Sequence, residues 1–357
     1  MDKKFFMGIA AMAALTLVSC SSDDLNSFSD NSSKNEAISF DGYLGRSAVA
    51  VNGTRGSVLD IKALQGLSEG FGVFGNYNST GGQKFGSDLF NNVQVTYKTS
   101  AWTYSPLKFW PTQGHIDFLA YAPYDSKYAD KVSKDNQKLE FEVNSDIKNQ
   151  KDLLYANAVG QTLDKISSTG NKVKFQFNHA LSKLGYKVKL SGDYSSNATF
   201  KLTKITLAGS PNGATKAFYT SGKIDLSKTN TASDLWSEYA AGRQNFDWFS
   251  GSSTVTGTDL KHPDENRAEN EDYLFVIPQK FKTGTDKLYV IVTYTITYTN
   301  DPTNSITNTV YKQLSNDFEP GKAYMINLTL GLPIEFDADV TPWGDDNSID
   351  CTEPWDR

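Results

Sequence analysis

The chain has 357 residues, of which 41 are acidic and 35 are basic, so its formal net charge is −6. Nucleic-acid-binding proteins normally present a basic face, and this balance argues against that class. The 21 phenylalanines and 18 tyrosines, together with many threonines, serines and asparagines, are typical of a secreted all-β protein. At roughly 150 residues each, there is room for about two domains.

The N-terminus reads as an export signal. Lys3 and Lys4 precede an apolar run from Phe5 to Val18, which is too short for a membrane span. The following Leu-Val-Ser-Cys sequence resembles a bacterial lipobox, in which the cysteine is lipidated after cleavage. We therefore expect residues 1–20 to be a lipoprotein signal peptide, with lipid such as palmitate on Cys20 and an outer-membrane precursor. Cys351 is the only other cysteine, so no intrachain disulfide is expected.

Residues 21–55 combine a tether with a first strand. The tether, 21–33, is rich in serine, aspartate and asparagine. A half-buried strand is predicted next, because four residues alternate with polar ones and tyrosine: Ile38, Phe40, Gly42 and Leu44. A polar run containing Arg46 and Arg55 follows. One interpretation is an ordinary first strand with an exposed loop. The other is a removable strand, cut by an Arg-specific protease between Arg55 and Gly56, with Arg46 as the second choice.

Alternation of apolar and polar residues predicts further strands along the whole chain. They lie at 71–74, 93–97, 115–122, 139–143, 173–177, 184–190, 200–207, 287–298, 324–330 and 334–340. A change of phase near Thr203 and Lys204 predicts a β-bulge. Short helices are expected at 180–184 and 232–239, and loops at 76–82, 191–197 and 250–257. We place one β-sandwich at 56–181 and a second at 182–357.

Four motifs, in this order, resemble signatures of the fimbrillin-like (Mfa-like) family of pilus proteins. They are WPTQGHIDFLAYAP at 110–123, DLLYA at 152–156, FQFNHALSKL at 175–184, and PGKAY at 320–324 with VTPW at 340–343. The ordered set spans nearly the whole mature chain.

The resemblance implies two transthyretin-like β-sandwich domains and assembly by strand exchange into a type V pilus of Gram-negative anaerobes. In that family a protease cuts after an arginine and removes the lipidated leader with the first strand. A strand of the next subunit then fills the groove. Thr54-Arg55-Gly56-Ser57 matches this cut in position and character. The implied partners are other subunits of a homo- or hetero-polymer, and the implied location is a cell-surface fimbrium that supports adhesion. Stalk, tip and anchor subunits are not separated by the sequence.

A candidate donor strand lies near the C-terminus. Its inward residues repeat the large-large-small-large order of the first strand: Ile334, Phe336, Ala338 and Val340. Such a strand can complete a neighbour's sheet, and head-to-tail donation builds a filament. Two alternatives stay open: the segment is the last strand of its own domain, or the donor lies after Trp343.

We assign no catalytic residue, cofactor or metal, and expect no enzyme. His115, His179 and His262 lack the spacing of metal ligands, so structural hydrogen bonds are favoured for His115 and His179. The aromatic residues Trp236, Phe246, Trp248 and Phe249 are expected in a core or domain seam. As a sugar-stacking platform they would instead support the alternative function, a non-polymerising surface glycan-binding lipoprotein.

Overall fold

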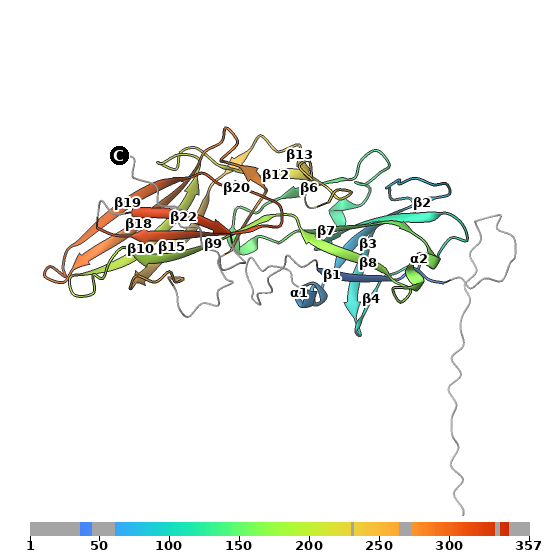
Figure 1. Ribbon diagram of the computed structural model, residues 1–357, viewed down its shortest axis with the longest axis horizontal. Coiled ribbons are helices and arrows are strands. Elements are labelled where there is room, and N and C mark those ends of the chain that lie inside the picture. The colour runs from blue at the N-terminus through green and yellow to red at the C-terminus, as the bar shows by residue number, and fades with distance from the viewer. Residues whose placement is uncertain (1–35, 45–60, 230–231, 264–272, 333–335, 343–357) are drawn as a thin grey trace, which may run out of the picture. The chain divides into compact units, whose positions relative to one another are not determined.

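Period-two alternation dictates an all-β architecture, and the computed structural model of the chain confirms it (Figure 1). The structure describes residues 36–44, 61–229, 232–263, 273–332 and 336–342. Only two α-helices occur in these ranges, α1 (Ile61–Gly66) and α2 (Leu163–Ser167). No helix within the same ranges is long and apolar enough to cross a membrane.

The first half of the chain builds a seven-stranded sheet in the order β1-β8-β7-β5-β2-β3-β4. The strands are β1 (Phe40–Leu44), β2 (Phe71–Asn78), β3 (Phe90–Lys98), β4 (Ala101–Thr103), β5 (His115–Ala122), β7 (Leu154–Gln161) and β8 (Val173–His179). Strand β5 is buried on both faces, as its two-sided apolar pattern predicts: Phe118 belongs to one core cluster and Leu119 to the other. All pairs are antiparallel except β1 with β8, which is parallel.

The second half contributes two four-stranded sheets that share one hydrophobic core. One has the order β15-β10-β18-β19, with β15 (Phe246–Val255), β10 (Ala198–Ala208), β18 (Leu288–Tyr298) and β19 (Ser305–Leu314). The other has the order β16-β9-β21-β22, with β16 (Leu274–Val276), β9 (Ser182–Leu190), β21 (Ala323–Leu330) and β22 (Phe336–Pro342). The predicted bulge is confirmed as a register shift between Leu202 and Lys204.

Shorter elements connect the two halves. Strand β6 (Lys138–Glu142) pairs with β12 (Ser221–Asp225), which also pairs with β13 (Trp236–Ser237). The remaining elements are β11 (Phe218–Tyr219), β14 (Arg243–Gln244), β17 (Gln279–Lys280), β20 (Asp317–Phe318) and the 3₁₀ turns η1 (Ser126–Tyr128) and η2 (Ile147–Asn149). The chain passes from the first sheet to another between His179 and Ser182, close to the proposed boundary. However, the β6–β12 pairing and the shared core cross that boundary.

Three local predictions were wrong. Residues 182–184 of the expected helix at 180–184 begin strand β9, and the expected helix at 232–239 contains the short strand β13 instead. The expected loop at 250–257 is largely the second half of β15. In each case pairing with neighbouring strands overrides weak local propensity.

Candidate assembly groove

The segment 36–44, which contains β1, is hydrogen-bonded on two sides. On one side it pairs with β8, in a register that puts Phe40 opposite Val173 and Leu44 opposite Phe177. On the other side, the residues just before it meet the segment after β4. There the Ile38 N–H donates to the Lys108 carbonyl at 2.8 Å, and the Trp110 N–H donates to the Glu36 carbonyl at 3.1 Å. The segment 36–44 therefore bridges β8 and residues 104–110 and closes the first core.

The inward face of this segment is fully packed. Ile38 and Phe40 are 1% and 2% exposed, and Gly42 is also buried, whereas Tyr43 on the opposite face is 44% exposed. The Phe40 ring contacts four other rings, with centroid distances of 5.4–5.6 Å, those of Phe90, Tyr104, Phe118 and Phe175. Aromatic pairs at these separations stabilise beyond their buried area. Phe40 is thus the main side chain that β1 gives to the core.

Gly42 marks a place where the groove admits only a small residue. A Cβ built on Gly42 would lie 3.1 Å from Phe177 Cε2 and 3.9 Å from Leu64 Cδ2. One methyl group fits there if the Phe177 ring shifts by a few tenths of an ångström, while a branched side chain does not. The buried positions therefore require the order large, large, small, with half-buried Leu44 following.

Removal of residues 36–44 would open this core on one side. The Val173 N–H would lose its 2.9 Å hydrogen bond to Ser39, and the Lys108 carbonyl and the Trp110 N–H would lose theirs. A buried backbone group left without a partner costs about 1–3 kcal/mol. An unpaired strand edge above an exposed apolar core is a template for another strand.

The candidate donor strand lies in the sheet of its own chain. Strand β22 pairs antiparallel with β21, with Ala338 opposite Leu328 and Val340 opposite Ile326. Ala338 is 4% exposed and Val340 is half-buried. Phe336 is the first residue of β22, and Ile334 lies outside the described residues. In this structure the segment is therefore the last strand of its own domain, which is one of the two alternatives left open by the sequence. Strand β22 is also the edge strand of its sheet.

The residues predicted for processing and anchoring lie outside the described ranges. They are Cys20, Arg46, Arg55 and Gly56, together with the tail after Trp343. Both arginines belong to the segment 45–60, which joins β1 to α1 along the chain. Lipidation and cleavage at these positions stay predictions.

Three of the sequence motifs meet at the start of β9. The His179 Nδ1 lies 2.7 Å from Asp152 Oδ2, and the Gly321 N–H and the Lys183 N–H bond the Leu181 and Lys322 carbonyls. Burial lowers the pKa of His179, but the charge and hydrogen bond of Asp152 outweigh it and leave that pKa raised. Burial also lowers the pKa of Lys183 to about 8, against the charge of Asp152. Sequence spacing alone did not pair Asp152 with His179, because the two residues are 27 positions apart.

The described residues offer no catalytic constellation. Gly66-Leu67-Ser68-Glu69-Gly70 has the spacing of a nucleophile elbow, but it joins helix α1 to strand β2 rather than a strand to a helix, and Ser68 Oγ donates to Glu69. Gly70 to Gly75 has dinucleotide-motif spacing but forms β2 itself. Among described residues no group of three or more potential ligands surrounds a metal position.

The aromatic set proposed as a sugar-stacking platform is packed inside. Trp236, Phe246 and Trp248 are 5%, 1% and 5% exposed, and Phe249 is half-buried. Trp236 Nε1 donates to the Ala180 carbonyl at 2.8 Å, so this side chain joins β13 to the chain between β8 and β9. The platform interpretation is wrong, because stacking on a sugar needs an exposed ring face.

Comparisons with known proteins give a family from a sequence model and a similar fold from a solved structure. A model of the fimbrillin-like family matches residues 64–343. A fimbrial protein from Bacteroides vulgatus ATCC 8482 is 20% identical, with a TM-score of 0.62 over 86% of this chain and 99% of its own. A putative cell adhesion protein from Bacteroides ovatus ATCC 8483 is 15% identical, with a TM-score of 0.49 over 88% and 100%. The comparison with curated proteins gave no match.

Proposed function

The chain belongs to the fimbrillin-like family, and on that premise we propose that it is a structural pilus subunit, stalk or tip, that is joined to its neighbours by donor-strand exchange and supports adhesion. The observation that carries the proposal is β1. The segment 36–44 that contains β1 closes a core and is hydrogen-bonded on two sides, yet its covalent link to α1 and the strands that follow is the segment 45–60.

Cleavage in that segment supplies the trigger. The precursor is exported as a lipoprotein with its lipid on Cys20 and is held at the outer membrane. While the chain is intact, β1 is tethered beside its groove, and its high effective concentration excludes any competing strand. Once an Arg-specific protease cuts between Arg55 and Gly56, or after Arg46, only non-covalent contacts retain β1. A strand from another subunit can then displace β1 from the groove, because both strands bind there without a covalent link.

The donor is the C-terminal segment with Ile334, Phe336, Ala338 and Val340. Aligned in the direction of β1, it places these residues at the positions of Ile38, Phe40, Gly42 and Leu44. Ala338 then meets the site where the groove accepts at most one methyl group, beside Phe177. For a stalk subunit, β22 must leave β21 to act in this way; its place at the edge of its sheet, with a strand on one side, supports such a release.

The processing step is tested with the purified full-length protein and an Arg-specific protease. We expect the protein to lose residues 1–55, to begin with Gly56 on N-terminal sequencing, and to form oligomers. Arg55→Ala should abolish the Gly56 N-terminus and lower the oligomer yield, and Arg46→Ala, with Arg55 intact, is the matched control. Oligomers of normal yield from the double variant Arg46→Ala/Arg55→Ala would contradict the proposed trigger. N-terminal sequencing of subunits from cell-surface filaments tests the same cut in the cell.

The alternative of a non-polymerising glycan-binding lipoprotein rested on the four aromatic residues around Trp248. Since three of them are buried and the fourth is half-buried, no observation at that location favours it.

A further inference from the structure

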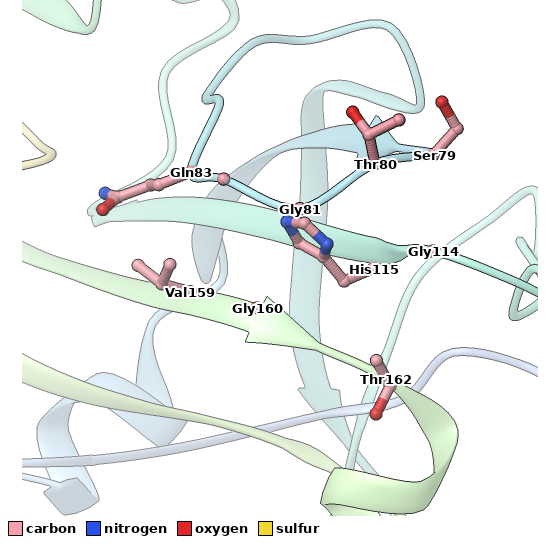
Figure 2. Close-up of a pocket in the computed structure, with 10 residues that line it drawn as sticks. Ser79, Thr80, Gly81, Gln83, Gly114, His115, Val159, Gly160 and Thr162 are labelled. Carbon is pink, nitrogen blue, oxygen red and sulfur yellow. The ribbon is translucent and has the colours of Figure 1, made fainter.

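We propose that a pocket at one end of the seven-stranded sheet binds a neutral saccharide. The pocket has a volume of about 510 Å³, within the size range of small-molecule sites. It lies among the loop after β2, the start of β5 and the end of β7 (Figure 2). The site is separate from the β1 groove, and the inference does not depend on strand exchange.

A buried carboxylate fixes the walls of this pocket. Asp117 on β5 is fully buried and accepts four contacts from three segments. Its Oδ2 accepts from Asn78 Nδ2 at 2.9 Å and from the Lys84 N–H at 2.7 Å, and its Oδ1 accepts from the Gly160 N–H at 2.6 Å. His115 Nε2 lies 3.5 Å from Oδ2. The loop at 79–83 is therefore anchored at both ends, and the His115 ring is oriented.

Local backbone geometry at the pocket is specified by glycines and a bulge. Opposite Asp117, the register between β5 and β7 shifts, so that Val159 and Gly160 form an irregular step. Gly160 has φ +61°, and Gly114 has φ +76° with no room for a side chain, since a Cβ there would lie 2.3 Å from the Asn78 carbonyl. Bulges are over-represented next to active sites, where they change the direction of a side chain.

The chemistry of the lining selects the ligand. Five lining residues carry polar side chains without a carboxylate, an ammonium or a guanidinium group: Ser79, Thr80, Gln83, His115 and Thr162. The others are four glycines and Val159, so apolar surface also contributes to the wall. In Figure 2 the His115 ring lies between Gly81 and the strand that carries Val159 and Gly160.

The charged groups next to the lining, Lys165 and Asp117, already have hydrogen-bond partners in the protein. Lys165 Nζ donates to the carbonyls of two lining residues, Val159 at 2.7 Å and Gly160 at 3.4 Å, and Asp117 accepts the hydrogen bonds given above. A pyranose presents hydroxyl groups that exchange hydrogen bonds with amides, hydroxyls and imidazole, and a C–H face that packs on an aliphatic wall. An anionic ligand would find no free cation among the described lining residues.

Direct binding tests the inference. The probes are glucose, galactose, mannose, fucose, N-acetylglucosamine and lactose, with sialic acid and inorganic phosphate as anionic comparators. Saturation-transfer NMR on the full chain, followed by titration, should detect at least one neutral sugar with millimolar affinity. Binding of none of the neutral sugars, or of the anions alone, would overturn the proposal.

Two variants locate the site. Gly81→Leu places a side chain in open space, because no atom lies within 4 Å of a Cβ built there, and it should weaken binding at least tenfold. Gly66→Leu is the matched control, also with open space, and should bind as wild type. His115→Ala removes the ring itself. Unchanged affinity in both Gly81→Leu and His115→Ala would place any sugar elsewhere. Because Arg55→Ala should bind sugar normally, failure of the pilus proposal and failure of this one are distinguishable.

Discussion

Gly42 and Tyr43 are neighbours in β1 that meet opposite environments. The Gly42 position faces Phe177 at the contact limit, while Tyr43 points outward and is 44% exposed. We predict that Gly42→Val destabilises the full-length protein by about 1–3 kcal/mol, because its branched side chain overpacks the core. Tyr43→Val should change the stability by less than about 0.5 kcal/mol, since it alters an exposed site. Urea denaturation measures both, and equal stability of the two variants would contradict the one-sided packing of β1.

The His179–Asp152 pair predicts a pH dependence of stability. The pKa of His179 is raised in the folded protein, so the folded state binds more protons than the unfolded state. The pair contributes its full stabilisation of the folded state below about pH 6.5, the pKa of histidine in the unfolded chain. This stabilisation is lost as the pH rises through the pKa of His179 in the folded protein. His179→Gln should therefore cost most stability at about pH 5–6 and progressively less above about pH 6.5.

The test measures the free energy of unfolding of the wild type and of His179→Gln from about pH 5 to above about pH 6.5 and compares the two at each pH. Lys183 also interacts electrostatically with the pair. Its pKa is lowered to about 8, and it is present in both proteins, so its own titration largely cancels. A destabilisation that is independent of pH would mean that His179 acts only by packing.

At the level of elements, the strand β22 can be tested as a ligand for the β1 groove. We predict that a labelled peptide of residues 332–343 binds the protein after cleavage at Arg55 but not before it, because the tethered β1 excludes competitors until then. A peptide with Ala338→Leu should bind at least tenfold more weakly, since Leu cannot occupy the site beside Phe177. Fluorescence anisotropy measures both affinities, with the double variant Arg46→Ala/Arg55→Ala as the control that keeps β1 tethered. Tight binding of the Leu peptide would exclude this register.

Strands with one buried face were predictable because their alternation survives in the sequence. In β18, buried and half-buried residues alternate along nearly the whole strand, as its apolar pattern predicts. Strand β19 was missed: it is an edge strand whose residues are mostly exposed or half-buried, so burial imposes little alternation on them. The predictions of short helices at 180–184 and 232–239 were wrong for a different reason. Pairing of β9 with β21 and of β13 with β12 determines the conformation of these segments, and such long-range pairing is not visible in the local sequence.

Contacts between distant motifs were beyond prediction from one sequence. Asp152 and His179 each stood in a recognisable motif, yet neither pattern says that the two side chains meet. The pocket around His115 was missed as well, because its organiser, Asp117, looked like an ordinary polar interruption of a buried strand. The β1 groove was predictable in part: the order of large and small residues was visible, but the dual pairing that closes the core was not.

At the scale of the whole molecule, the two proposed sandwiches are expected to unfold together. Ile224 on β12 lies opposite Leu139 on β6, and the two side chains are 1% and 2% exposed within the core cluster that also contains both C-terminal sheets. A core shared across a domain boundary couples the two parts, because neither can unfold without exposing the apolar surface of the other. We predict a single calorimetric transition for the full-length chain.

Ile224→Ala tests this coupling, with an expected loss of about 2–5 kcal/mol from the whole transition. Ile306→Ala on β19 is the matched control; its side chain is 47% exposed, so the transition should move little. If calorimetry instead resolves two transitions and Ile224→Ala shifts only one, the boundary near residue 181 separates independent domains. In the proposed filament, force applied at the β1 groove in the first half would be resisted by contacts of the second half through β6 and β12. Weakening this seam should therefore lower the force at which a filament subunit unfolds.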